Sequence, residues 1–127
     1  MAATAEVKVD FYEKGDGTAP VEQFLDGLER PARAKGLAII KNLKDQGLNL
    51  PFPYSSQVKG KLRELRTQYG KDKLRILYFS NSRRTFILLH GILKRTQKLE
   101  ASDIKIAQQR MEQHEARLGG KKHDHKI

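Results

Sequence analysis

The chain has 127 residues and carries 25 Lys and Arg against 15 Asp and Glu, a formal net charge of +10. This length fits one domain and excludes a two-domain nucleotide-binding enzyme. Cysteine is absent, which excludes disulfides, thiol nucleophiles and Cys-ligated metals. The longest apolar run, residues 86–89, is far below the ~18 residues of a membrane span, and the N-terminus lacks a signal-peptide pattern. We therefore expect a cytoplasmic protein with no membrane partner.

The basic residues are concentrated in the second half of the chain. Residues 59–98 hold 12 Lys or Arg against only Glu64 and Asp72, so this segment alone has a net charge of +10. A field concentrated in this way predicts a polyanion or an acidic protein as partner, because scattered charge would only increase solubility. The alternative is a solvated basic surface with no partner.

The first half of the chain predicts a strand followed by a helical hairpin. Apolar and polar residues alternate over 7–12, which is typical of a half-buried strand. Thr18 is a possible N-cap for a short helix, whose apolar face consists of Val21, Phe24, Leu25 and Leu28. Pro31 can open a second helix, which ends near Gly47 and whose apolar positions are Ala34, Leu37, Ile40 and Leu43.

The second half predicts an antiparallel meander. Residues 48–56 contain two prolines and form a surface connection. Phe52 and Tyr54 are expected to attach this connection to the core, and the alternative is that their rings stack on RNA bases. Strands are predicted over 61–67, 73–80 and 83–93, with short turns between them. The last two strands are apolar on both faces, so we expect helices to cover them.

A final helix and a short tail complete the chain. Ser102 or Asp103 can cap the helix, and Gly119-Gly120 is expected to end it. Its apolar stripe consists of Ile104, Ala107, Met111, His114 and Leu118. The order β-α-α-β-β-β-α predicts an α+β domain over residues 1–118, in which helices pack on a small antiparallel sheet, followed by a disordered basic tail over 119–127.

The sequence offers no pattern for a metal or a cofactor. His90 and His114 are in separate predicted elements, and His123 and His125 are in the tail, whereas a catalytic zinc site usually needs three protein ligands. Neither a Walker pattern nor a Gly-rich dinucleotide pattern occurs. We expect neither a metal nor a cofactor.

Basic residues follow the predicted meander. The start of one antiparallel strand lies beside the end of its neighbour, so these groups can converge on one sheet surface. Arginine binds phosphate oxygens with two donors and can stabilise a pentacovalent transition state, while a Lys, Glu or His can exchange the proton of a 2′-hydroxyl. The pattern therefore favours RNA as ligand. The basic residues concerned are Lys59, Lys61, Arg63, Arg66, Arg75, Lys94 and Arg95.

Three blocks in this segment resemble a known family. Leu62-Arg63-Glu64-Leu65-Arg66, Leu74 to Phe79, and Leu88 to Lys98 are similar, in this order, to the phage-derived Gp49-like branch of the HigB/RelE toxin superfamily. The resemblance covers roughly residues 7–115. It implies a RelE-like fold, a toxin of a type II toxin–antitoxin system, and metal-independent cleavage of mRNA on the ribosome. It also implies a cognate antitoxin, in this branch usually a helix-turn-helix protein.

The resemblance also assigns roles to individual residues. Arg75 matches the active-site arginine that contacts the scissile phosphate. Arg66 and the Lys94-Arg95 pair would supply further phosphate contacts, and Glu64 or His90 would transfer protons. The remaining RNA-binding positions are Lys59, Lys61, Arg63 and Lys73.

Several alternatives remain open at the level of sequence. Instead of transferring protons, Glu64 can serve only to neutralise Arg63 or Arg66 across the sheet, and His90 can be a core histidine. Gly91 can mark a bulge or a close backbone approach. A ParE-like gyrase poison with the same fold, or a non-catalytic RNA- or ribosome-binding module, would also account for the basic strands.

Overall fold

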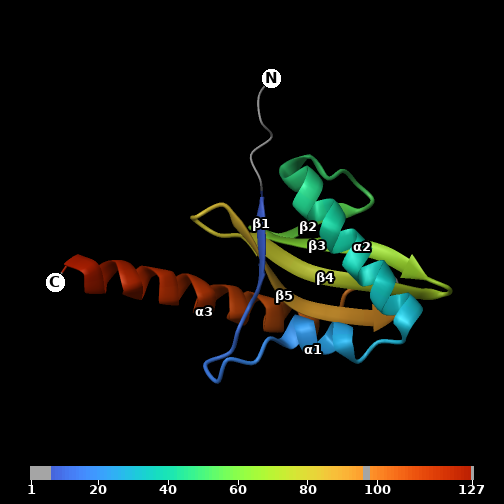
Figure 1. The fold of residues 1–127 in the computed structure, drawn as a ribbon, viewed down its shortest axis with the longest axis horizontal. Coiled ribbons are helices and arrows are strands. Elements are labelled where there is room, and N and C mark those ends of the chain that lie inside the picture. The colour runs from blue at the N-terminus through green and yellow to red at the C-terminus, as the bar shows by residue number, and fades with distance from the viewer. Residues whose placement is uncertain (1–6, 96–97, 127) are drawn as a thin grey trace.

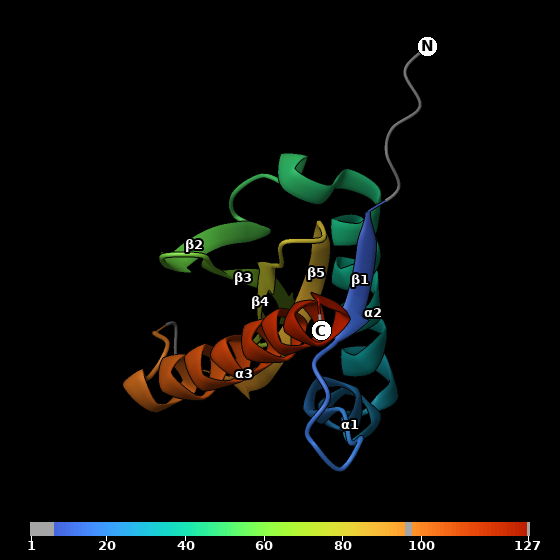
Figure 2. The same ribbon diagram turned by 90° about the vertical axis from the view of Figure 1, so that its left-hand side faces the viewer.

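The computed structural model describes residues 7–95 and 98–126 and confirms the α+β class. A five-stranded sheet with the spatial order β1-β5-β4-β3-β2 separates two helices from a third (Figure 1, Figure 2). The elements follow the chain as β1 (Lys8–Phe11), α1 (Pro20–Asp26), α2 (Arg30–Gln46), a 3-10 helix (Gly47–Asn49), β2 (Ser55–Lys59), β3 (Leu62–Tyr69), β4 (Asp72–Ser80), β5 (Thr85–Lys94) and α3 (Ala101–Lys126).

The predicted strand and helical hairpin are present in the first half. Helix α1 begins at Pro20, which suits a first helical position because its missing N–H has no helical partner there. Thr18 does not cap this helix; Ala19 is the N-cap, and the Thr18 hydroxyl instead donates to Oδ1 of Asp16 at 2.7 Å. Val21 and Leu25 are buried, as the predicted face of α1 requires.

The predicted face of α2 is confirmed at Ile40 and Leu43 but wrong at Ala34 and Leu37, which are exposed. The helix buries Ala32, Gly36, Ile39 and Leu43, whereas Leu37 is 51% exposed. A strict three-residue spacing rotates around a helix of 3.6 residues per turn, so only alternating steps of three and four keep one face toward the sheet. Gly36 lies on this face, where α2 packs closely against α1. A Cβ at this position would be only 2.8 Å from the Leu25 side chain, so a glycine fits there.

The sheet contains two features that the sequence pattern did not predict. The first feature is strand β2 (Ser55–Lys59), part of which the sequence pattern assigned to the surface connection. Its polar residues directly follow the prolines and show no apolar alternation. Strand β1 pairs with β5 in parallel, from Lys8 opposite Thr85 to Phe11 opposite Leu88, while β2 to β5 form the antiparallel part. The sheet is therefore mixed rather than wholly antiparallel.

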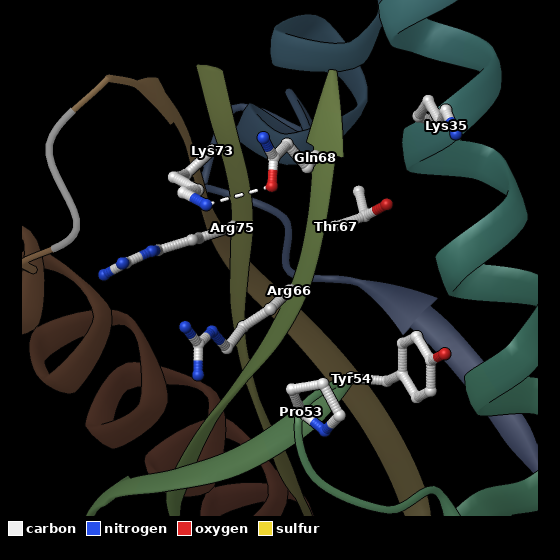
Figure 3. A pocket seen from close by; sticks show the side chains of 8 residues that line it. All are labelled: Lys35, Pro53, Tyr54, Arg66, Thr67, Gln68, Lys73 and Arg75. Atoms are coloured by element: carbon white, nitrogen blue, oxygen red, sulfur yellow. Dashed lines mark hydrogen bonds between the residues drawn. The ribbon is translucent and has the colours of Figure 1, made fainter. Parts of the chain in front are cut away.

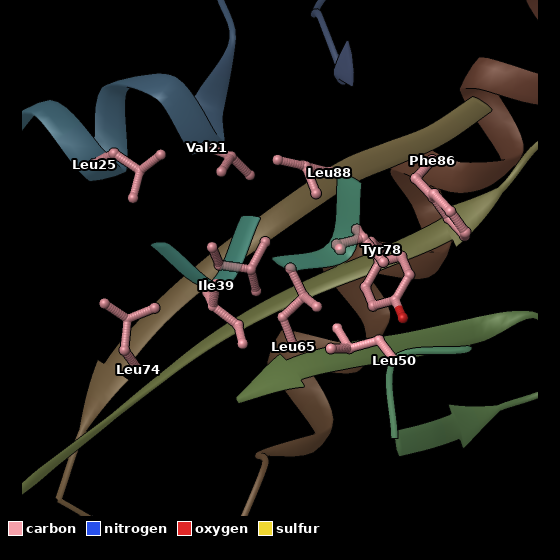
Figure 4. Packing of buried hydrophobic residues seen from close by; sticks show 11 residues of the cluster. Val21, Leu25, Ile39, Leu50, Leu65, Leu74, Tyr78, Phe86 and Leu88 are labelled. Carbon is pink, nitrogen blue, oxygen red and sulfur yellow. The ribbon is translucent and has the colours of Figure 1, made fainter. Parts of the chain in front are cut away.

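Apolar residues fill both faces of β4 and β5, as predicted. On one face α1 and α2 cover a cluster from the sheet and the helices (Figure 4). On the other face α3 covers a second cluster that contains Leu62, Leu77, Phe79 and Leu89. The first cluster defines the α2 face of the sheet, and the second defines the α3 face.

Helix α3 keeps its predicted stripe but not its predicted limits. Ala107 is buried, and Ile104 and Met111 pack against the cluster on the α3 face. The helix begins at Ala101, before both predicted caps, and continues through Gly119-Gly120 to Lys126. Glycine only lowers helix propensity, by about 1 kcal/mol, and leaves the backbone hydrogen bonds in place. The division of the chain at residue 118 stays a prediction, and Ile127 is outside the described residues.

Within residues 7–95 and 98–126, no helix combines the length and the apolar character that crossing a lipid bilayer requires.

Candidate functional site

The register of β3 and β4 brings three charged side chains together on the α3 face. Arg66 lies opposite Arg75, and Glu64 lies opposite Leu77, the next position of β4 on the same face. Side chains alternate along a strand, so Glu64 and Arg66 share the face of Leu62, and Arg75 shares the face of Leu77. Arg75 is only 6% exposed and Glu64 only 8%. The centre of the site is thus a buried carboxylate between two guanidinium groups.

The Glu64 carboxylate has charged neighbours but an unsatisfied oxygen. Its Oε1 is 3.6 Å from Nε of Arg75 and 3.8 Å from Nε of Arg66. Within the part of the chain that the structure describes, this buried Oε1 accepts no hydrogen bond. Burial raises the pKa of Glu64 above its ordinary value, although the positive charges of Arg75 and Arg66 act in the opposite direction. Glu64 therefore has the environment of a proton acceptor as well as the position of a neutralising charge.

A β-bulge in β5 brings His90 and Lys94 to the same face. Leu77 pairs with His90, but the next residue, Tyr78, pairs with Leu88, so Leu89 is an extra residue in β5. An extra residue reverses the side-chain alternation of everything that follows it in the strand. His90 and Lys94 therefore lie on the α3 face, opposite Leu77 and Lys73, rather than against α1 and α2.

Asp103 of α3 connects these two residues. Nε2 of His90 lies 2.9 Å from its Oδ1, and Nζ of Lys94 lies 3.3 Å from its Oδ2. Burial alone would raise the pKa of Asp103, but the hydrogen bonds from His90 and Lys94 lower it below its ordinary value. Lys94 also contacts Glu100, whose hydrogen bond raises the pKa of Lys94. The Asp103 carboxylate thus fixes the His90 ring at the edge of the site.

A cavity of about 360 Å³ opens next to the two arginines (Figure 3). It extends around the end of β3, from Arg75 and Lys73 to Tyr54 and to Lys35 of α2. In Figure 3 the side chains of Arg66 and Arg75 extend to one side of β3, while Lys35 and Tyr54 lie on the other. The cavity is therefore bordered by cations and by an aromatic ring.

The prediction that Phe52 and Tyr54 attach the proline loop to the core is wrong. Phe52 is 71% exposed and Tyr54 is 50% exposed. The guanidinium of Arg66 lies over the Phe52 ring, 5.6 Å from its centroid. The loop thus presents aromatic surface beside the arginine cluster.

Some of the predicted RNA-binding residues lie away from this cavity. Lys61, in the turn between β2 and β3, forms an ion pair with Glu115 of α3 at 2.9 Å. Lys59 is exposed at the end of β2, next to this turn. Arg63 points to the α2 face, where it donates to Oγ of Ser55. The basic strands therefore do not form one continuous RNA-facing surface, and RNA binding by these three residues stays a prediction.

The other predicted residues lie near the site. Lys73 lines the cavity and donates to Oε1 of Gln68 at 2.9 Å. The Arg95 side chain is largely exposed, and its Nε lies 3.4 Å from Oδ1 of Asp72. Sequence reasoning missed Lys35 and Asp103. Lys35 is on a helix distant in sequence, and Asp103 resembled a helix cap because an acidic residue in a first turn is common there.

No group of three or more His, Asp or Glu residues that could hold a metal ion occurs in the described ranges.

The fold and the site define a small α+β protein with a buried carboxylate between two arginines and a cation-bordered cavity. Residues 23–112 match the model of a family described as phage-derived protein Gp49-like, and the chain belongs to this family. It is a RelE/HigB-like toxin family, so the chain is related to toxins of toxin–antitoxin pairs, which have an antitoxin as partner. No curated protein matches the chain.

Proposed function

We propose that this protein is a toxin that cleaves mRNA on the ribosome, and that the cleavage uses the RNA 2′-hydroxyl and requires no metal. The observation that carries the proposal is the Glu64 carboxylate, buried 3.6 and 3.8 Å from the Nε atoms of Arg75 and Arg66. A phosphodiester needs positive charge at its oxygens and a base at its nucleophile. The three side chains meet both needs.

The reaction begins at the 2′-hydroxyl. Glu64 accepts its proton, O2′ attacks the adjacent phosphorus, and the bond from phosphorus to O5′ breaks. The products are a 2′,3′-cyclic phosphate, which can hydrolyse to the 3′-phosphate, and a 5′-hydroxyl. Arg75 and Arg66 bind the non-bridging oxygens, whose charge increases in the pentacovalent transition state.

The leaving O5′ needs a proton, and we assign this proton to His90. The His90 ring lies on the same face as Arg75, and Asp103 fixes its orientation. Asp103 occupies Nε2 of the ring, so Nδ1 is the nitrogen from which we propose that His90 delivers the proton. Lys94 and Arg95 then bind neighbouring phosphates.

Replacement of Arg75 tests the proposal. Arg75→Ala should lower mRNA cleavage on programmed ribosomes by about 10²-fold or more, because a donor to the transition-state oxygens is removed. Primer extension on the mRNA measures this, and circular dichroism checks that the variant is folded. Arg83→Ala, an exposed arginine in the β4–β5 turn, is the matched control and should cleave normally.

Unchanged cleavage by Arg75→Ala would contradict the proposed site. If the wild-type protein cleaves no mRNA but inhibits a DNA-supercoiling assay, it is instead a gyrase poison. RNA binding without either effect would identify a non-catalytic RNA- or ribosome-binding module. We propose that the antitoxin is a helix-turn-helix protein that binds the toxin in the cytoplasm. A toxic wild-type protein has to be produced together with it.

A further inference from the structure

The outer edge of β3 is open beyond Leu65. Strand β2 pairs with β3 from Leu62 to Leu65, and the amide of Arg66 then donates to the Tyr54 carbonyl at 2.8 Å. Backbone groups alternate in direction along a strand, so the N–H and C=O of Gln68 point the same way as those of Arg66. The cavity of about 360 Å³ lies around this edge. A ligand in the cavity can therefore reach a backbone donor and a backbone acceptor of Gln68.

The Gln68 side chain holds its end of the cavity in place. Its Oε1 accepts from Lys73 at 2.9 Å, and its Nε2 donates to the Gly70 carbonyl at 2.8 Å. Both ends of the amide are thus satisfied within the protein. The edge of β3 is a preformed feature, which suits a ligand of defined shape.

Tyr54 gives the cavity an aromatic wall. Tyr54 is 50% exposed although it lines a concave surface, and Phe52, two residues before it, is 71% exposed and lies under the Arg66 guanidinium. Any of the four nucleobases can stack on such a ring, and an alanine substitution removes this stacking interaction.

Lys35 gives the cavity a separate cation on the α2 side. No carboxylate of the described residues lies within ion-pair distance of its ammonium group, whereas Lys41 on the same helix pairs with Asp45. An exposed, unpaired lysine at the mouth of a cavity is available for a phosphate. Lys35 and the two arginines lie on opposite sides of the edge (Figure 3).

We propose that this cavity is a nucleotide subsite for single-stranded RNA. A nucleobase stacks on Tyr54, its edge contacts the backbone groups of Gln68, and Lys35 binds the flanking phosphate. The strand then passes over the edge of β3 to Arg66 and Arg75. This assignment rests on the proposed function, since it names the nucleotide next to the scissile phosphate.

Binding of single-stranded 2′-fluoro RNA tests the subsite without cleavage, because this RNA has no 2′-hydroxyl nucleophile. Tyr54→Ala should weaken binding about tenfold or more, the range of base stacking, while Tyr54→Phe should bind normally. Fluorescence anisotropy of a labelled oligonucleotide measures the affinity. Leu48→Ala removes another exposed apolar side chain, outside the cavity, and should have no effect.

Lys35 gives an independent readout. Lys35→Ala should lower the slope of log affinity against log salt by about 0.7, the value for one phosphate of a single strand. Lys44→Ala, an exposed lysine elsewhere on α2, should leave the slope unchanged. Normal binding by both Tyr54→Ala and Lys35→Ala would overturn the subsite, as would the absence of binding by the wild-type protein.

The outcomes separate this inference from the proposed function. Cleavage on ribosomes with normal RNA binding by both variants would leave the nuclease in place and remove the subsite. Absent cleavage with weakened binding by both variants would support the subsite and contradict the nuclease.

Discussion

Glu64 illustrates how a charged residue can serve both structure and chemistry. Its carboxylate offsets the repulsion between Arg66 and Arg75, which face each other on neighbouring strands. The same burial that makes this pairing close also disfavours the charged form of the carboxylate. A carboxylate with a raised pKa binds a proton more readily than an ordinary glutamate, which suits a general base.

The proposed role of Glu64 predicts a particular pH dependence. As the pH is lowered, the rate of cleavage should begin to fall at a pH above the ordinary titration range of glutamate, because the pKa of Glu64 is raised. This decrease is the acid limb of the pH–rate profile. Glu64→Gln should lower the rate by about 10²-fold or more and remove this acid limb, since a general base contributes about this much. Single-turnover cleavage on ribosomes across pH measures both effects. Asp45→Asn on α2 is the control and should keep the acid limb.

The raised pKa of Glu64 also predicts a pH dependence of stability, whatever its role in cleavage. Its folded-state pKa is above the unfolded value, so its contribution to stability is complete below the unfolded pKa and is lost as pH rises through the folded pKa. The wild-type protein should therefore lose stability relative to Glu64→Gln over this pH interval. If the two proteins differ in stability in this way but Glu64→Gln cleaves RNA with an unchanged acid limb, Glu64 is not the base.

The strand positions of the two arginines could be predicted from the sequence, but the groups around them could not. Arg66 and Arg75 lie on strands that the sequence pattern predicted, and these strands place them opposite each other, while their roles in RNA binding stay predictions. The role of Glu64 stayed open, because sequence spacing contains neither burial nor distances. Asp103 was missed as a partner of His90 because that contact depends on the docking of α3 on β5.

The elements show where local pattern is a sufficient guide. Strands β4 and β5 were predicted to be covered on both faces, because an apolar run has no side that tolerates water. Half of the predicted face of α2 was wrong, and the parallel pairing of β1 was not predicted, because both depend on how elements meet in space. The bulge that decides on which face Lys94 lies is at Leu89, two residues before the Gly91 position that the sequence offered for one.

Gly91 offers a direct test of how α1 packs on β5. A Cβ at Gly91 would lie 2.3 Å from Cδ2 of Phe24, so the close approach that the sequence left open is observed. Gly91→Ala should lower the free energy of unfolding by about 1–3 kcal/mol, the usual cost of overpacking. Denaturant unfolding measures this, and Gly15→Ala, where a Cβ meets no atom within 4 Å, is the control.

A double variant identifies the cause of the loss. In Phe24→Ala the space opposite Gly91 is empty, so adding Gly91→Ala should cost much less than in the wild-type background. Equal costs in the two backgrounds would show that the ring does not exclude the methyl group.

Over the whole molecule, the net charge of +10 is divided among several surfaces. Lys61 pairs with Glu115, and Arg63 lies on the α2 face. Arg83 and Arg84 occupy the β4–β5 turn. The segment of highest charge therefore contributes only part of its cations to the cavity. Total charge predicted a polyanion as partner, but the fold decides which charges such a partner can meet.

The prediction of one domain over residues 1–118 can be tested by truncation. The side chains through which α3 contacts the sheet and the N-terminal segment extend to Arg117, which donates to the Glu13 carbonyl. Figure 1 shows the end of α3 extending past the sheet. Deletion of residues 119–127 should therefore change the free energy of unfolding by less than about 0.5 kcal/mol.

A longer deletion is the comparison for this truncation. Deletion of residues 110–127 removes Met111 from the core and the Gln113 side chain that accepts from the Tyr12 hydroxyl. This variant should unfold at much lower denaturant concentration. Unfolding of the shorter truncation to the same extent would place the domain boundary beyond residue 118.

The parallel pairing of β1 with β5 has a consequence during synthesis. Residues 8–11 are among the first described residues to be made, but their partners, residues 85–88, are made more than seventy positions later. Helix α1 also packs on β5, so the apolar faces of the first half have no sheet to cover while the chain is being made. Arg75, His90 and Asp103 complete the site only after most of the chain has left the ribosome. A chain released early would therefore lack the assembled site.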